Sequence, residues 1–294
     1  MIESFVNYLV YEKRYSPNTI ISYKNDIKQF YKYIENSYSV YDIKSINHYM
    51  IRSWLVDLMQ NDIKPKSINR KFSSLRTYFL FLKREGKVDV NPTKKVIPPK
   101  TGKRLPSVVQ KKEMDFLLDE LIFSEDFHGY RDKVIISILY NTGMRRAELI
   151  NLKDYDFDYV SGTVKVLGKG NKERIIPLTY DVISLLKTYM DIRNSFFEHN
   201  SFNYTILTDK GNKLYPKFVY NVVTKYLSMV SSVDKKSPHV LRHSIATHLA
   251  DEDVELNAIK TMLGHANLSA TQIYTHNSIE KLKRAYKKAH PKAN

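Results

Sequence analysis

Apolar residues recur at helical spacing along much of the chain, most regularly in its first ninety residues. Ser16 and Pro17 suit the N-cap and first helical position of a helix. The apolar positions that follow are three or four residues apart, on one helical face: Ile20, Tyr23, Ile27, Phe30, Tyr31 and Ile34. Further helices are predicted over 2–13, 47–60 and 66–85, and Gly86 provides a left-handed stop after the last one. This part of the chain is therefore predicted to be all helical.

The second half of the chain has a mixed pattern. Two segments rich in β-branched residues, GTVKVLG and KERIIPL, flank the turn Gly168-Lys169-Gly170-Asn171 and predict a short hairpin. Helices are predicted around it, over 110–121, 129–142, 179–193, 216–230, 239–250, 255–263, 269–276 and 278–289. The fold class expected is mainly α, with an α+β second domain that carries a small antiparallel sheet.

The segment NPTKKVIPPKTGKRLP, from Asn91 to Pro106, separates the two halves. It has four prolines, one glycine and no acidic residue, so we predict an extended linker. The chain of 294 residues is long enough for two domains of roughly 100–200 residues each. We therefore expect a helical domain at 1–90, a basic linker at 91–106 and a second domain at 107–294.

The charge balance points to a polyanionic partner. Lys and Arg number 47 against 31 Asp and Glu, a net charge of +16, and the sequence pI is near 9.6. Such an excess favours nucleic acid first and an anionic membrane surface second, although a merely soluble basic protein would also show it. Five cations of the linker would lie well along a phosphate backbone, unless the linker is only a solvated spacer: Lys94, Lys95, Lys100, Lys103 and Arg104.

The composition excludes several kinds of chemistry. The sequence has no Cys, so disulfides, thiolate zinc sites, iron–sulfur clusters and thiol nucleophiles are absent. No stretch approaches the roughly 18 uninterrupted apolar residues of a membrane span. The first residues, MIESFVNYLV, lack the basic region and cleavage site of a signal peptide. A cytoplasmic protein without a membrane segment is expected.

Several charged residues could act in catalysis. In PHVLRHSIATHL, His239 and Arg242 are three positions apart at a predicted helix start, so they could grip one anion together. His239, His243 and His248 also suggest a metal site, but the acidic residue of H-E-x-x-H is missing, and no metal is expected. We interpret His243 and His248 as packed or hydrogen-bonded structural histidines.

Two further cations follow glycine residues. Arg145 comes just after Gly143, where a helix is predicted to end, and taken alone it could be an ordinary surface charge. Lys169 stands at the tip of the predicted hairpin, where it could reach into a groove. The segment around Lys169 does not match G-x-x-x-x-G-K-[ST], so ATP is not implied.

Four motifs in this order give a specific resemblance: TGMRRAEL, GKGNKER, HVLRHSIATHL and LGHANLSATQIYTH. Their order and spacing resemble the tyrosine recombinase family, and the N-terminal half is most similar to its Xer subfamily. The resemblance covers nearly the whole chain. It implies a SAM-like helical core-binding domain, followed by a catalytic domain with a small sheet.

The resemblance also implies roles for six residues. Tyr274 matches the nucleophile that forms a 3′-phosphotyrosine, and Arg145 and Arg242 match the pair that holds the phosphate. Lys169 matches the general acid for the leaving 5′-oxygen. His239 matches the residue that assists proton movement, and His265 a residue that hydrogen-bonds the phosphate. The cationic site implied by these residues fits chemistry without a metal, and the tyrosine ester conserves the bond energy, so rejoining needs no nucleotide cofactor.

The function implied is recombination between two double-stranded DNA sites by four protomers, homo- or heteromeric. In the Xer subfamily this resolves chromosome or plasmid dimers, with a second Xer recombinase and a septal DNA translocase as partners. Three alternatives remain open: an integrase of a mobile element with the same chemistry, a sequence-specific DNA-binding protein without catalysis, and a type IB topoisomerase. A basic tail at 278–294 is expected to pack against the neighbouring protomer, as in related recombinases; a tail that folds back on its own catalytic domain and a disordered basic end are the alternatives.

Overall fold

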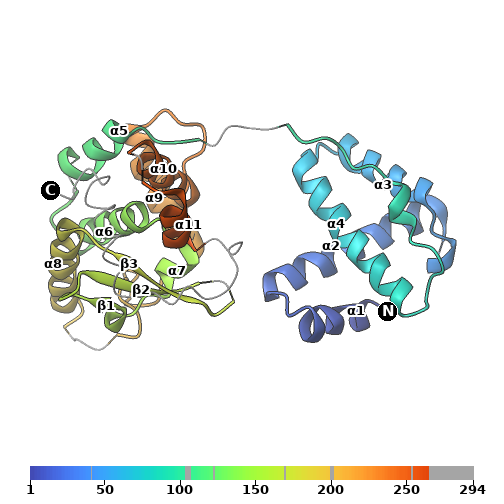
Figure 1. The fold of residues 1–294 in the computed structure, drawn as a ribbon, viewed down its shortest axis with the longest axis horizontal. Coiled ribbons are helices and arrows are strands. Elements are labelled where there is room, and N and C mark those ends of the chain that lie inside the picture. Colours follow the sequence, from blue (N-terminus) through green and yellow to red (C-terminus); the bar gives the residue numbers. More distant parts are fainter. Residues whose placement is uncertain are drawn as a thin grey trace. The chain divides into compact units, whose positions relative to one another are not determined.

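The chain divides into two compact units, Met1–Arg104 and Leu105–Asn294 (Figure 1). The computed structural model describes residues 1–40, 42–102, 107–121, 123–168, 170–198, 202–252 and 254–264. The helices predicted at 269–276 and 278–289, and the basic tail that contains the second of them, lie outside the described residues.

Helices form the N-terminal unit, as predicted. The elements in chain order are α1 (Ile2–Asn7), the π-helical turn η1 (Tyr8–Glu12), α2 (Pro17–Tyr38), the short 3₁₀ helix η2 (Ile43–Ser45), α3 (His48–Gln60), α4 (Pro65–Arg84) and the 3₁₀ helix η3 (Pro92–Lys95). Pro17 takes the first position of α2, and Gly86, just beyond α4, has a φ of +65°. Both local signals in the sequence therefore mark the helix ends correctly.

The core of this unit is rich in aromatic side chains. Ile27, Phe30 and Ile34 of the predicted apolar stripe on α2 are fully buried. The Phe30 ring meets the Trp54 ring of α3 edge to face, with centroids 5.0 Å apart. Offset and edge-to-face arrangements of this kind add to the stabilisation from apolar burial. The stripe predicted from the sequence is thus the face that α2 turns toward the core.

The first part of the predicted linker is not extended. Asn91 accepts hydrogen bonds from the Thr93 backbone N–H (2.9 Å) and hydroxyl (2.7 Å) and so begins η3. Val96, just after η3, is buried among the core residues of the N-terminal unit. The prediction of an extended linker is therefore wrong for η3, because the Asn-Pro-Thr sequence caps a short helix and Val96 packs behind it.

The second unit combines helices with a small sheet. Its elements are α5 (Lys111–Asp115), the π-helical turn η4 (Phe116–Glu120), α6 (Phe127–Thr142), α7 (Arg146–Ile150), the 3₁₀ helix η5 (Asp154–Asp156), β1 (Phe157–Asp158), β2 (Thr163–Leu167), β3 (Glu173–Pro177), α8 (Tyr180–Phe196), α9 (Pro216–Val230), α10 (Pro238–Asp251) and α11 (Leu256–Leu263). The helices predicted up to residue 263 and the hairpin are confirmed, whereas α7 and β1 were not anticipated.

The sheet is antiparallel, with strand order β1-β2-β3. Val164 pairs with Ile176 and Val166 with Arg174, so these four side chains share one face. All four are buried, while Lys165 on the opposite face is exposed. Side chains alternate between the buried and the exposed face along each strand, and this alternation places one charged residue, Arg174, on the buried face.

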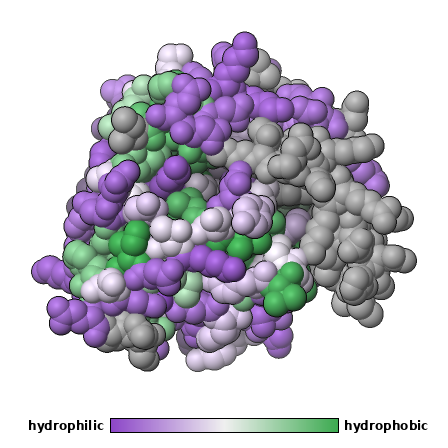
Figure 2. Space-filling model, turned by 90° about the vertical axis from the view of Figure 1, so that its left-hand side faces the viewer, coloured by the Kyte–Doolittle hydropathy of each residue, from purple (hydrophilic) through white to green (hydrophobic). Residues whose placement is uncertain are grey.

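Helix α6 lies at the centre of this unit, packed against α8, α9 and α10 (Figure 1). From Val134 to Thr142 every residue is buried, so this helix is surrounded on all sides. On the face of this unit that Figure 2 shows, most of the described surface is hydrophilic, with apolar patches between the hydrophilic side chains. Within the part of the chain that the structure describes, no helix has the length and apolar character needed to cross a membrane.

Candidate active site

Arg145 stands at the tight turn between α6 and α7. Gly143 ends α6 with a φ of +58°. A Cβ atom on Gly143 would lie 2.5 Å from Leu263 Cδ2, so both the backbone conformation and the space require glycine. Arg145 then caps α7 in an extended conformation. The turn predicted after Gly143 is confirmed, and it brings Arg145 next to α11.

The Arg145 side chain is held at two points. Its Nη1 donates to Glu148 Oε1 (2.9 Å) and its Nη2 to the Gly264 carbonyl oxygen (3.1 Å). A guanidinium has five N–H donors, so these described contacts use only part of its capacity. The side chain is 34% exposed. Arg145 is therefore fixed in direction while keeping donors for an anion.

Arg242 approaches the same place from α10. Its Nη1 donates to the Gly143 carbonyl and its Nη2 to the Leu263 carbonyl, both at 2.5 Å. Burial and the positive charge of Arg145 lower the pKa of Arg242 to about 10. A group with that pKa is still almost entirely charged at neutral pH. The two arginines predicted from separate motifs are thus neighbours with unused N–H donors.

The C-terminal end of α11 gathers these side chains. The last carbonyls of a helix have no partners within the helix and form its negative end. Gly264 ends α11 in the left-handed conformation, with a φ of +66°. Three guanidinium groups donate to three successive carbonyls: Arg174 to Met262, Arg242 to Leu263 and Arg145 to Gly264.

Glu148 is the carboxylate at the centre of this cluster. It is buried, and burial alone would raise its pKa. Hydrogen bonds from Arg174, from the Arg145 backbone N–H and from the Arg145 guanidinium outweigh burial, and the pKa of Glu148 is lowered. Two guanidinium groups therefore bond to this ionised carboxylate, and Arg242 is close enough to interact with its charge, so the cluster carries an excess of positive charge.

His239 lies in the first turn of α10, one turn before Arg242, and its side chain is exposed. Partial loss of hydration and the charges of Arg146, Arg242 and Arg145, together with nearby His243, lower the pKa of His239. The imidazole is therefore uncharged at neutral pH and able to accept a proton. The predicted grouping of His239 with Arg242 on one helix start is confirmed.

Three other predicted site residues, Lys169, His265 and Tyr274, lie outside the described residues, as do Lys103 and Arg104 of the linker. The described residues that directly precede Lys169 and His265 lie close to the cluster. Gly264, which precedes His265 in sequence, accepts from Arg145. Gly168, which precedes Lys169, donates to the Lys172 carbonyl (2.8 Å) and closes the base of the predicted hairpin. Lys94, Lys95 and Lys100 are exposed on the N-terminal unit.

Sequence analysis missed two residues of the cluster, Glu148 and Arg174. A signal for each was available. Glu148 precedes the apolar pair Leu149 and Ile150 in a short helix, and Arg174 occupies an inward position of a strand whose other inward residues are apolar. A charged residue on a buried face needs a partner of opposite charge, so the two could have been paired.

The other histidines of α10 differ from each other. His248 is buried, and its Nδ1 lies 2.8 Å from the Tyr140 hydroxyl, as expected for a structural histidine. His243 is exposed, which does not fit a packed histidine. Across the described ranges, no three His, Asp or Glu side chains gather where they could hold a metal ion.

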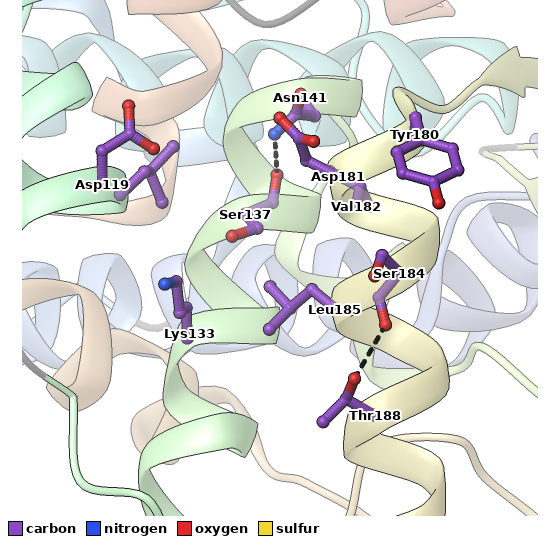
Figure 3. A pocket seen from close by; sticks show the side chains of 11 residues that line it. Asp119, Lys133, Ser137, Asn141, Tyr180, Asp181, Val182, Ser184, Leu185 and Thr188 are labelled. Atoms are coloured by element: carbon purple, nitrogen blue, oxygen red, sulfur yellow. Dashed lines mark hydrogen bonds between the residues drawn. The ribbon is translucent and has the colours of Figure 1, made fainter.

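A polar pocket lies elsewhere in the unit, between α6 and α8 (Figure 3). Lys133, Ser137 and Asn141 line it from α6, and Asp181 and Thr188 from α8. Of the residues assigned catalytic roles, the three that the structure describes, Arg145, His239 and Arg242, are not among those that line this pocket. The arginine cluster at the end of α11, rather than this pocket, is therefore the candidate active site.

Comparisons with known proteins show two matching family models. A family model described as the phage integrase family matches residues 107–281. A second model, the N-terminal SAM-like domain of phage integrase, matches residues 2–86. These two matches correspond to the two units of the fold, and the first contains every residue of the cluster.

Individual relatives extend over nearly the full chain. Tyrosine recombinase XerD of Staphylococcus haemolyticus is 36% identical over 295 residues, covering 100% of this chain and 99% of its own. Tyrosine recombinase XerC of Chlorobaculum parvum is 32% identical over 317 residues, covering 99% and 94%.

Solved structures show the same fold. The XerH site-specific recombinase, bound to its palindromic difH substrate after cleavage, has a TM-score of 0.72 and 25% identity. The match covers 90% of this chain and 78% of the XerH chain. The chain therefore belongs to the phage integrase family and is a tyrosine recombinase, an enzyme that cuts and rejoins DNA in site-specific recombination.

Proposed function

We propose that this recombinase acts through a 3′-phosphotyrosine at Tyr274 and resolves dimers of chromosomes or plasmids. In the cleavage step, the Tyr274 oxygen forms a bond to phosphorus and the bond from phosphorus to the 5′-oxygen breaks. Lys169 gives its proton to the leaving 5′-oxygen. Rejoining is the reverse of this step and needs no nucleotide. The assignment to dimer resolution is supported by the full-length similarity to XerC and XerD proteins.

The gathering of Arg145 and Arg242 is the observation that carries this proposal. They come from motifs almost a hundred positions apart, yet both bond to the last residues of α11. Phosphoryl transfer builds negative charge on the non-bridging oxygens, and fixed guanidinium forks stabilise that charge best when their positions are set in advance. The remaining N–H donors of the two side chains suit these oxygens.

In this proposal, His239 accepts the proton that the nucleophile Tyr274 loses. A phenol with an ordinary pKa near 10 is a poor nucleophile at neutral pH. Because the pKa of His239 is lowered, its imidazole is free to accept the Tyr274 proton, while the arginines favour the phenolate electrostatically. His265 adds a hydrogen bond to the phosphate. No metal ion or organic cofactor takes part in this scheme.

Both domains contribute to DNA binding in this proposal: the helical domain at 1–90 and the catalytic domain at 107–294, joined by the basic segment at 91–106. The exposure of Lys94, Lys95 and Lys100 supports backbone contacts from this segment. Four protomers assemble on two sites in the cytoplasm, with a second Xer recombinase and a septal DNA translocase as partners. The XerH complex with difH supports a short duplex site as the substrate.

The test is the Tyr274→Phe variant on a nicked suicide substrate, which traps the covalent intermediate. The variant keeps the ring but lacks the oxygen, so we expect unchanged DNA affinity and no covalent protein–DNA adduct. Tyr180→Phe, which changes an 81% exposed tyrosine on α8, is the matched control and retains the adduct. A persistent adduct with Tyr274→Phe would contradict the assignment.

A further inference from the structure

Arg174 joins three elements of the catalytic unit although it is almost fully buried. It projects inward from β3 and is 5% exposed. Its Nη1 and Nη2 donate to Oε1 and Oε2 of Glu148 on α7, at 3.0 and 2.8 Å. Its Nε donates to the Met262 carbonyl at the end of α11 (2.8 Å). One planar side chain therefore fixes a strand, a helix start and a helix end to one another.

Glu148 passes this constraint on to Arg145. Its Oε1 accepts from Arg145 Nη1 (2.9 Å) as well as from Arg174, and its Oε2 accepts from the Arg145 backbone N–H (2.7 Å) as well as from Arg174. Each of the two carboxylate oxygens thus accepts one hydrogen bond from Arg145 and one from Arg174. Rotation of the carboxylate would break bonds on both sides, so the position of Arg174 sets the position of the Arg145 guanidinium.

Two glycines lie tightly against Arg174. A Cβ atom on Gly264 would lie 3.3 Å from three Arg174 atoms, including Cδ and Nε, and one on Gly168 would lie 3.3 Å from Arg174 Nη1. These glycines directly precede His265 and Lys169 in the sequence. The Arg174 side chain therefore also sets the spacing between the base of the hairpin and the end of α11.

We propose that Arg174 is a positioning residue for DNA cleavage, acting through Glu148 on Arg145 rather than through contact with DNA. Its burial excludes direct contact with the duplex, whereas Arg145 is 34% exposed. Lysine could keep the charge, but a point-charge ammonium does not reproduce a planar fork with a third donor on Nε. This inference rests on the proposed function, which places Arg145 at the scissile phosphate.

The experiment compares Arg174→Lys with Arg193→Lys in the full chain. Arg193 is 1% exposed, donates to both Asp154 oxygens (3.1 and 3.0 Å) and to the Thr205 carbonyl (2.9 Å), and has no described contact with the arginine cluster. The two substitutions therefore remove similar buried bonds at different places. Thermal midpoint, DNA affinity and single-turnover cleavage of a suicide substrate are measured for each variant.

We expect similar decreases of thermal midpoint in the two variants and unchanged DNA affinity. Cleavage should slow about 10- to 100-fold in Arg174→Lys alone, because small misplacements of a catalytic group have effects of that size. Equal cleavage rates in the two variants would overturn the inference, since Arg174 would then be only a structural residue.

A double-mutant comparison tests the route through Arg145. If Arg174 acts by placing Arg145, adding Arg174→Lys to Arg145→Lys should slow cleavage much less than Arg174→Lys does alone. Independent, multiplicative defects would contradict this route. If the Tyr274→Phe variant still forms the covalent adduct, the proposed chemistry itself is refuted. If Tyr274→Phe forms no adduct but Arg174→Lys cleaves DNA normally, only the role of Arg174 is refuted.

Discussion

Arg242 donates a hydrogen bond from Nη1 to the carbonyl oxygen of Gly143, which lies 99 positions earlier in the chain. This bond ties α10 to the turn that presents Arg145. The second bond of Arg242, to Leu263, and that of Arg145, to Gly264, then join both side chains to α11. The phosphate-binding pair is therefore assembled on backbone carbonyls, and its geometry depends on the backbone of three segments.

Replacing Arg242 by lysine should disable cleavage while leaving the fold intact. The ammonium keeps the charge but cannot bond two carbonyls and a phosphate in one plane. We expect single-turnover cleavage to fall by about 10²–10³, the usual effect of removing one preorganised donor to a transition-state oxyanion. Arg193→Lys is the control for a buried arginine, and near-normal cleavage by Arg242→Lys would contradict its place at the phosphate.

Neutralising Lys94, Lys95, Lys100, Lys103 and Arg104 to glutamine should weaken binding to cognate and scrambled duplexes alike. A protein that touches fewer phosphates releases fewer counterions, so the log–log slope of affinity against salt should flatten by at most about 0.9 for each phosphate no longer neutralised. Binding isotherms on both duplexes at several salt concentrations check this. A defect confined to the cognate duplex would instead indicate base recognition by this segment.

Gly143→Ala should be much more destabilising than Gly162→Ala. Both glycines have a positive φ, +58° and +63°, so both alanines carry about 1–2 kcal/mol of backbone strain. At Gly143 the new methyl would also lie 2.5 Å from Leu263 Cδ2, whereas at Gly162 the nearest atom is 3.4 Å away. Overpacking adds about 1–3 kcal/mol, which denaturant unfolding should resolve. Equal destabilisation would show that the clash with Leu263 is easily relieved.

The stability of the catalytic unit should fall as the pH drops below about 6.5, the ordinary pKa of histidine. Burial lowers the pKa of His248, so the unfolded chain takes up a proton in a range where the folded chain does not. Stability from this group is complete above the unfolded pKa and is lost as the pH falls through the folded pKa.

His248→Gln should therefore reduce the slope of unfolding free energy between pH 5 and about 7, a range that spans the ordinary pKa of histidine. His243→Gln, which changes an exposed histidine of the same helix, should leave the slope as it was. Denaturant unfolding at several pH values measures both variants. An unchanged slope in His248→Gln would assign the acid sensitivity to other groups, such as His239.

Local sequence signals determined most of the elements, and the ordered set of four motifs pointed to the candidate catalytic residues. Pro17 begins α2, and Gly143 ends α6, because caps and left-handed stops act within a few residues and need no distant partner. The order and spacing of the four motifs, taken together, resemble a known family, and that resemblance assigns roles to two arginines, two histidines, a lysine and a tyrosine. These features could be read without any knowledge of packing.

The tertiary structure alone decided which of these residues meet and what holds them. Helix α7 has five residues and β1 has two, too short for a periodic pattern to predict. The bond from Arg174 to Met262 spans 88 positions, and that from Arg145 to Gly264 spans 119. Such contacts form because a buried charge and the unpaired carbonyls at a helix end are costly without hydrogen-bond partners. Only the packing of the whole unit determines which partners lie within hydrogen-bonding distance.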